Sequence, residues 1–174
     1  MELRQCGRDD ISQLMQLALQ SYREHYMYLW TEERYALWYM EKSFARPSLE
    51  RQLEQPCSAF YFVCSQGTPI GFVKTNTGKS VDGSPTEKAW ELERIYLLKA
   101  ATNKGIGGHA MKEVVQLARN GKAETLWLKS MDSSPSVRFY EKMGFRTIAT
   151  ETLPFEGFKD EYRNMKVMRL DLEP

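Results

Sequence analysis

The sequence has few cysteines, no long apolar run and no excess of charge of one sign. Its three cysteines, Cys6, Cys57 and Cys64, follow no repeated spacing, and no Cys or His pair has the spacing of a zinc site. We therefore expect reduced thiols, no disulfide framework and no metal centre.

Membrane and nucleic-acid partners are not predicted. No run of roughly 18 apolar residues is present, and the first residues lack the apolar core of a signal peptide. Lys+Arg (24) and Asp+Glu (23) leave a formal net charge of +1. Proteins that hold phosphates usually concentrate basic residues, and no such concentration is present. We expect a soluble, cytoplasmic protein.

The remaining composition is that of a packed domain. Hydrophobic residues make up 42% and aromatic residues 12% of the 174 residues, which is enough for a continuous core. No repeat, linker or low-complexity segment divides the chain, so we predict a single domain over residues 1–174.

The apolar pattern predicts an α/β chain. Helical periodicity indicates helices at 11–28, 31–44, 106–119 and 135–143, with a further turn or two at 48–54 after Pro47 ends the second helix. Alternating or β-branched runs indicate strands at 3–6, 59–64, 70–75, 90–98, 125–128, 145–152 and 165–172. The stretch 78–88 is rich in Gly, Ser and Pro and is interpreted as a loop. This order predicts a mixed sheet with helices on both faces.

A glycine-rich loop between a strand and a helix carries the first chemical signal. Residues 91–111 read ELERIYLLKAATNKGIGGHAM, so Gly105, Gly107 and Gly108 stand where the helix begins. Unpaired backbone N–H groups at a helix start bind anions, and glycine lets a phosphate approach. A dinucleotide-binding turn fits less well, because several residues separate the strand from Gly105. A P-loop is excluded by the absence of its Gly-Lys-Ser/Thr ending, and a turn without ligand stays open.

At this segment the sequence resembles the GNAT acetyltransferases, whose signature is a strand, then Q/R-x-x-G-x-G/A, then a helix. The resemblance implies a mostly antiparallel GNAT sheet and acetyl-CoA as cosubstrate. It also implies that the strand backbone binds the pantetheine arm and that the loop binds the diphosphate. The residues so assigned are Ile95, Tyr96, Leu97, Asn103, Lys104, Gly105, Ile106, Gly107 and Gly108. Thr102 departs from the pattern, since the family usually has Gln or Arg there.

A second family segment lies at residues 126–145, LWLKSMDSSPSVRFYEKMGF, and its end is similar to the family's F-Y-E-K-x-G-F. Ser133 replaces the usual Asn and Ser136 the usual Ala, and a hydroxyl at Ser133 can still bond the cofactor. The resemblance covers residues 58–172 well and the first 57 residues only in outline.

Acetyl transfer to an amine needs a neutral nitrogen and a proton for the departing thiolate. By resemblance, Tyr140 is the general acid beside the sulfur, and Glu93 or Glu91 is the base. Glu93 matches a carboxylate of polyamine-acetylating members and is favoured, whereas Glu91 matches the one of histone-acetylating members. His25 is a further candidate base, and His109 is expected on the helix surface.

The acceptor is predicted less sharply than the cosubstrate. Aromatic and acidic residues crowd residues 22–41, which suits a cationic amine, and the pattern E-x-E-R-I-Y is similar to that of bacterial polyamine acetyltransferases. A small amine, with polyamines first, is therefore the expected partner. A protein or peptide N-acetyltransferase, which would need an open groove, and a non-catalytic acyl-CoA sensor are the alternatives. Family members are often dimers, so a homodimer stays open.

Overall fold

The computed structural model describes residues 1–102 and 104–172. The strands are β1 (Glu2–Gln5), β2 (Ser58–Ser65), β3 (Thr68–Lys79), β4 (Pro85–Leu97), β5 (Thr125–Met131), β6 (Arg146–Thr152) and β7 (Asn164–Asp171). The α-helices are α1 (Ile11–Tyr26), α2 (Glu33–Phe44), α3 (Arg46–Leu53), α4 (Ile106–Asn120) and α5 (Ser136–Lys142). Short 3-10 turns lie at η1 (Arg8–Asp10), η2 (Met27–Leu29), η3 (Lys99–Ala101) and η4 (Asp160–Tyr162).

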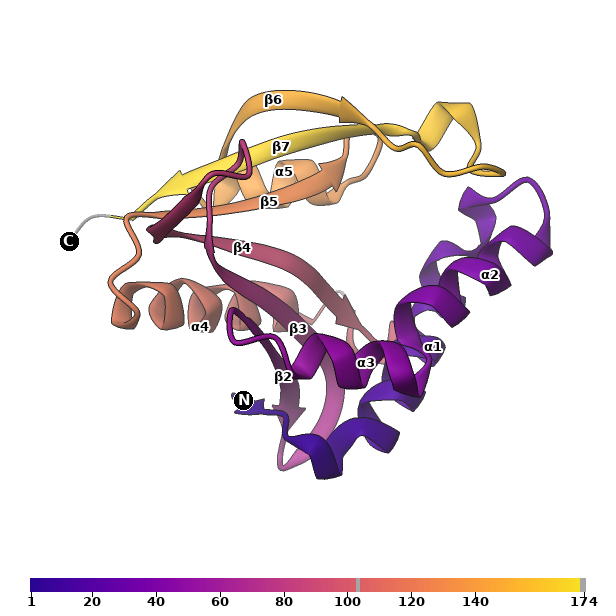
Figure 1. The fold of residues 1–174 in the computed structure, drawn as a ribbon, viewed down its shortest axis with the longest axis horizontal. Coiled ribbons are helices and arrows are strands. Elements are labelled where there is room, and N and C mark those ends of the chain that lie inside the picture. Colours follow the sequence, from indigo (N-terminus) through magenta and orange to yellow (C-terminus); the bar gives the residue numbers. More distant parts are fainter. Residues whose placement is uncertain (103, 173–174) are drawn as a thin grey trace.

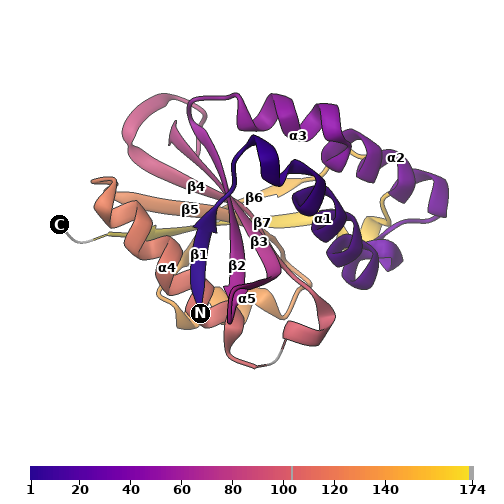
Figure 2. The ribbon, with the colours of Figure 1, turned by 90° about the horizontal axis from the view of Figure 1, so that it is seen from below.

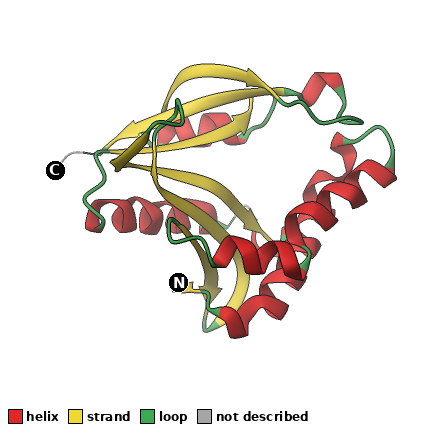
Figure 3. Cartoon of the chain, in the orientation of Figure 1, coloured by secondary structure: helices red, strands yellow, loops and turns green. Residues whose placement is uncertain are grey.

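In the described part of the chain the strands form one seven-stranded sheet in the order β1-β2-β3-β4-β5-β7-β6. Neighbouring strands run antiparallel except β4 and β5, which are parallel and are connected through α4. A parallel pair needs such a crossover, because a tight turn cannot return the chain to the same end of the sheet. Figure 1 shows β4 and β5 diverging from this short pairing, and Figure 3 shows the helices around the sheet. The mixed, mostly antiparallel sheet that the sequence predicted is confirmed.

The helices cover the two faces of the sheet separately, as the view in Figure 2 shows. On one face, α4 and α5 pack against Val73 and Leu92, and buried residues of α4 follow the helical spacing of Ala110, Val114 and Ala118. On the other face, α1 to α3 pack against a cluster that includes Phe72. Phe72 and Val73 are consecutive in β3 and point to opposite faces, so both sides of the strand are buried.

Two local interpretations of the sequence need correction. The loop predicted at 78–88 is confined to residues 80–84, because β3 continues to Lys79 and β4 begins at Pro85. Gly78 instead stands at a register shift between the strands and has a φ of 78°, a conformation that glycine adopts without strain. Pro47 does not follow α2 as a terminator but occupies the first turn of α3, where a missing N–H costs no helical hydrogen bond.

No helix in the described residues combines the length and the apolar character needed to cross a bilayer.

Candidate active site

A cavity of about 260 Å³ opens where β4 and β5 separate. The last parallel pair is Leu92 with Leu128, and beyond it the two strands diverge and residues of both line the cavity. The opposite wall comes from the first helices and from the segment between β6 and β7. The lining residues are Tyr22, Tyr26, Leu29, Tyr39, Leu92, Glu93, Arg94, Ile95, Tyr96, Leu128, Lys129, Ser130, Met131, Ser134, Ser136, Tyr140, Leu153, Phe155, Phe158 and Met165. The two sequence-predicted chemical groups Glu93 and Tyr140 thus reach one cavity.

A β-bulge at Glu93 determines which side chains face this cavity. Lys74 of β3 pairs with Arg94, while the next residue Thr75 pairs with Leu92, so Glu93 is an extra residue on β4. The Asn76 amide donates hydrogen bonds to Glu91 (2.8 Å) and to Glu93 (2.7 Å), which places both carboxylates on one face. Glu91 is buried and is not among the lining residues, so it stands behind Glu93.

Glu93 is an ionised carboxylate held by two cations. Lys74 Nζ lies 2.5 Å from one carboxylate oxygen, and Arg94 Nη2 lies 3.2 Å from the other. Burial would raise the pKa of Glu93, but the Arg94 and Lys74 charges and the hydrogen bonds from Lys74 and Asn76 outweigh it and lower this pKa. Lys74 is itself buried, and because burial outweighs its pairing with Glu93, its pKa is also lowered.

Tyr140 lies on α5, packed between Phe139 and Phe145 at centroid distances of 5.2 and 5.8 Å. Burial raises the pKa of its hydroxyl well above the ordinary value, so the group is protonated at neutral pH. Such a hydroxyl can donate a proton to a developing anion.

Three serines lie beside Tyr140 in the lining. The Ser136 hydroxyl lies 2.9 Å from that of Ser130 and 2.6 Å from that of Ser134. Ser133, the residue at the family's Asn position, is exposed and outside the lining, so its predicted cofactor contact stays a prediction. Ser130 and Ser134 were not predicted as site residues, because nothing beyond their place within the second segment, residues 126–145, distinguishes them in the sequence.

A backbone seam closes the cavity between the first helices and the segment after β6. Thr31 N donates to Gly157 O (2.8 Å), Lys159 N donates to Leu29 O (2.9 Å), and Trp30 and Phe158 form an antiparallel bridge between these bonds. In Figure 1 the loop after β6 reaches the end of α1 and the start of α2. The cavity is therefore roofed on this side by paired backbone.

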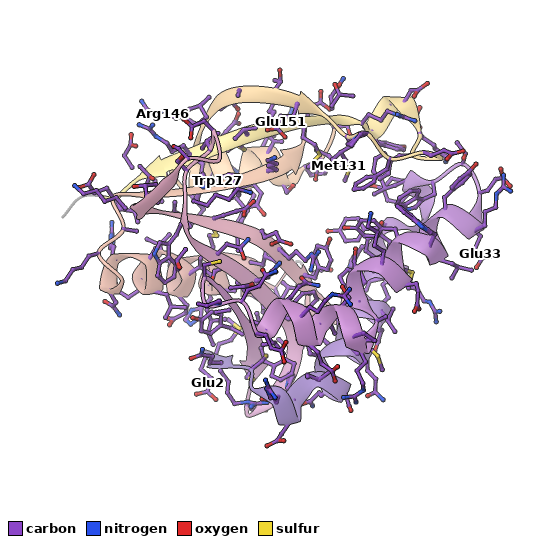
Figure 4. All side chains as sticks on the ribbon, in the orientation of Figure 1. Glu2, Glu33, Trp127, Met131, Arg146 and Glu151 are labelled. Atoms are coloured by element: carbon purple, nitrogen blue, oxygen red, sulfur yellow. The ribbon has the colours of Figure 1, made fainter. Side chains whose placement is uncertain are left out.

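Tyrosines form the wall below the roof. Tyr22 stacks on Tyr39 at 5.1 Å, and its hydroxyl accepts a hydrogen bond from Trp30 Nε1 (2.9 Å). Tyr26 lies 5.2 Å from Tyr22, and burial raises the pKa of Tyr26 to about 12. These rings fix the helices and give the cavity an aromatic surface. Figure 4 shows the side chains of this region between Met131 and the first helices.

A second cavity, of about 190 Å³, extends toward the glycine loop. It is lined by His25, Tyr26, Ile95, Leu97, Thr102, Gly107 and Phe139. His25 lines this second cavity and does not line the first. Its Nε2 atom is buried and has no hydrogen-bond partner among the described residues. His109 is exposed on α4, beside Glu113, as predicted.

The glycine loop has the form of an anion site. Gly105 caps α4 with a φ of 76°, and the first intrahelical bond runs from His109 N to Gly105 O. The amides of Ile106 to Gly108 have no backbone acceptor among the described residues and can donate to a ligand. A Cβ at Gly107 or Gly108 would come no nearer than 3.9 Å to the side chains of Leu97 and Phe139. The chain therefore does not require glycine there, and the space that a side chain would fill suits a diphosphate. Lys104 and Ile106 flank Gly105, whereas Asn103 lies outside the described residues.

The edge of β4 beside this cavity offers a binding surface for an extended ligand. Pairing with β5 ends at Leu92, while pairing with β3 continues to Leu97, so on the β5 side no strand bonds the backbone of Ile95 to Leu97 in the described residues. An extended arm can bind this free edge as a strand would. The Tyr96 side chain points away, into the aromatic cluster of the helices.

Comparison with known proteins agrees with this geometry. The chain is 25% identical over 107 residues to the uncharacterized N-acetyltransferase in the pepI 3' region of Lactobacillus delbrueckii subsp. lactis, covering 61% of this chain. It is 23% identical over 146 residues to the uncharacterized N-acetyltransferase MJ1207 of Methanocaldococcus jannaschii, covering 82% of this chain. The matches span 62% and 59% of the lengths of these relatives.

Among solved structures, the PaiA N-acetyltransferase of Thermoplasma acidophilum, in complex with coenzyme A, has the same fold. Its TM-score is 0.75 at 19% identity, over 98% of both chains. The family model of the acetyltransferase (GNAT) family matches residues 12–145. With the glycine loop, the free strand edge and the divergent strands in place, the chain belongs to the GNAT acetyltransferase family.

Proposed function

We propose that this protein transfers the acetyl group of acetyl-CoA to the primary amine of a small molecule. The observation that carries the proposal is a single roofed cavity lined by both Glu93 and Tyr140. The second cavity and the glycine loop are suited to the cosubstrate, and the first cavity to the acceptor.

The roof supports a small acceptor over a peptide. A peptide would have to pass between the first helices and the segment after β6, and there the backbones of Leu29 and Thr31 bond those of Lys159 and Gly157. The Thr31 hydroxyl adds a third bond, to Gly157 O at 3.1 Å. Opening this seam would remove several hydrogen bonds worth about 0.5–1.5 kcal/mol each, whereas a small amine needs no such change.

The residues divide the chemistry as follows. Acetyl-CoA supplies the thioester, the amine nitrogen forms the new N–C bond, and the C–S bond breaks. Tyr140 donates a proton to the departing sulfur. Glu93 accepts a hydrogen bond from the amine and positions it. Because the pKa of Glu93 is lowered, this carboxylate does not take up a proton, and the ammonium loses its first proton to the solvent before it attacks. The nitrogen loses a second proton as the amide forms, and this proton replaces the one that Tyr140 gives to the sulfur. Glu91, behind Glu93, holds Asn76 in place.

The test is thiol release from acetyl-CoA in the presence of small amines and of peptides with a free amino terminus or lysine. Polyamines belong in the panel because of the sequence pattern around Glu93. We expect release with small amines and none with peptides. Faster acetylation of a peptide than of any small amine would contradict the proposal.

Binding of acetyl-CoA without release, for every acceptor, would favour the sensor alternative. The Tyr140→Phe variant separates the two, because a sensor does not use the hydroxyl. We expect the variant to lose thiol release and to keep its affinity for coenzyme A.

A further inference from the structure

The acceptor cavity presents a carboxylate and a guanidinium side by side. Because the bulge makes Glu93 an extra residue, Glu93 and Arg94 are consecutive and yet both line the cavity. In a regular strand they would point to opposite faces. Their side chains lie 3.2 Å apart, from Arg94 Nη2 to Glu93 Oε1.

Arg94 is held in position from the helix side. Its Nη1 donates to Gln52 Oε1 at 3.0 Å, and its guanidinium lies 5.3 Å from the centre of the Phe44 ring. Gln52 is itself fixed, since its amide donates at 3.2 Å to Ser43 O and to the carbonyl and hydroxyl of Ser48. A guanidinium has five N–H donors, and its side-chain contacts in the described residues involve Nη1 and Nη2 only, which leaves donors for a ligand.

The charges of the cavity do not favour a polycation. The charged lining residues are Glu93, Arg94 and Lys129, and Lys129 pairs with Glu151 at 2.6 Å. Glu93 is the lining carboxylate, and it already contacts the Arg94 and Lys74 charges. A polyamine would bring several positive charges to a wall with two cations and one carboxylate. A ligand with one positive and one negative charge matches this wall better.

We propose that the acceptor is an amine that bears a carboxylate on the adjoining carbon, with an apolar or aromatic side chain. Its ammonium contacts Glu93, its carboxylate accepts hydrogen bonds from Arg94, and its side chain packs on Tyr22, Tyr26 and Tyr39. This substrate class, that of hydrophobic α-amino acids, rests on the proposed small-amine acetyltransfer at the same site.

The experiment compares pairs of acceptors that differ only by the carboxylate, which are tyrosine with tyramine and phenylalanine with phenethylamine. Spermidine is tested as a separate acceptor. Binding to the protein saturated with coenzyme A is measured by calorimetry, and kcat/KM is measured by thiol release from acetyl-CoA. Because a hydrogen bond between charged groups is lost with the carboxylate, we expect each amino acid to have an affinity and a kcat/KM about tenfold to a hundredfold higher than those of its decarboxylated partner. Because calorimetry needs no turnover, the comparison does not depend on the rate of the chemical step.

The Arg94→Gln variant tests the assignment to Arg94. We expect the ratio within each pair to fall to about one, while the affinity for coenzyme A is unchanged and shows that the variant is folded. Arg146→Gln is the control, because Arg146 is exposed on β6 and paired with Asp171, and it should keep the wild-type ratio.

Three outcomes would contradict, in turn, the substrate class, the role of Arg94 and the proposed function. Tighter binding or faster acetylation of spermidine or of the decarboxylated amines overturns the inference and leaves the small-amine acetyltransfer standing. A ratio that survives Arg94→Gln overturns the role of Arg94. Absence of thiol release with every amine overturns the proposed function, and this inference with it.

Discussion

Replacing Lys74 with methionine tests how the partly buried carboxylate of Glu93 is held. The Lys74 side chain is 6% exposed and that of Glu93 is 26% exposed, with 2.5 Å between Nζ and Oε2. Methionine keeps much of the side-chain length and the contact with Phe60 but removes the charge.

Removing one partner of a buried ion pair costs about 3–5 kcal/mol. Two observations move the expected loss downward. Glu93 keeps Arg94 and Asn76 as partners, and removal of the ammonium also removes its desolvation cost, which is the cause of the lowered pKa of Lys74. We therefore expect a loss of about 2 kcal/mol, or a fall in Tm of about 4–8 °C.

The assay is urea unfolding of the wild type, Lys74→Met, Glu93→Gln and the double variant at pH 7. The double variant removes one positive and one negative charge together, so Arg94 and the carboxylate of Glu91 keep the site balanced, and Arg94 keeps its bond to Gln52. The double variant should therefore regain at least half of the loss of Lys74→Met. Lys88→Met is the control, since Lys88 and Glu124 form an exposed pair whose loss should not be measurable. If Lys74→Met unfolds like the wild type, or if the double variant is no more stable than Lys74→Met, the Lys74 charge does not hold Glu93 in this way.

The free energy of unfolding of the wild type and of Glu93→Gln should depend differently on pH. The pKa of Glu93 is lower in the folded state than its ordinary value of 4.5, so its contribution to stability is present above that pH. It is lost as the pH falls through the lower folded-state pKa. Below pH 4.5 the wild type should therefore lose stability more steeply than Glu93→Gln, and equal slopes would contradict the assignment.

Three further changes have expected outcomes. Tyr140→Phe should lower kcat about a hundredfold to ten-thousandfold with unchanged coenzyme A affinity, and because the raised pKa keeps this hydroxyl protonated, the wild type should show no Tyr140 titration near neutral pH. His25→Ala should weaken coenzyme A binding in calorimetry about two- to tenfold, because the buried Nε2 atom of His25 has no partner in the described residues and is expected to bond the cosubstrate. His109→Ala should leave the affinity unchanged, and equal affinities of the two variants would exclude a contact between His25 and coenzyme A. Gly157→Ala should lower Tm and speed hydrogen exchange of the Thr31 amide, since the residue has a φ of 72° and a new Cβ would lie 2.1 Å from the Tyr35 ring; unchanged exchange would contradict the role of the seam.

Helices and strands could be predicted wherever the signal is local. The range 106–119 was predicted for a helix found at Ile106–Asn120, because apolar side chains recur there at helical spacing over four turns. The errors have one cause. Gly78 and Pro47 were interpreted as chain breakers, although glycine also marks bulges and proline also begins helices.

The candidate site was predictable only in part. Glu93, Tyr140 and the glycines stand in two continuous motifs, so their order along the chain was sufficient to group them. The roof joins Trp30 to Phe158, from opposite ends of the sequence, and no local pattern reports that pairing. The bulge that turns Arg94 toward the cavity could not be predicted from the sequence pattern either. Strict alternation of side chains along β4 would place Arg94 on the opposite face from Glu93.

The short parallel ladder also determines the order in which this chain can fold. In the described residues, strand pairing between the antiparallel parts β1–β4 and β5–β7 is limited to the pairs from Ala89 with Thr125 to Leu92 with Leu128. Hairpins form within microseconds, whereas contacts between segments distant in sequence form later because a longer loop must close first. During refolding we expect helix and strand signals to return before the affinity for coenzyme A. The cavity where β4 and β5 separate exists only after β1–β4 and β5–β7 have joined, so ligand binding there indicates that folding is complete.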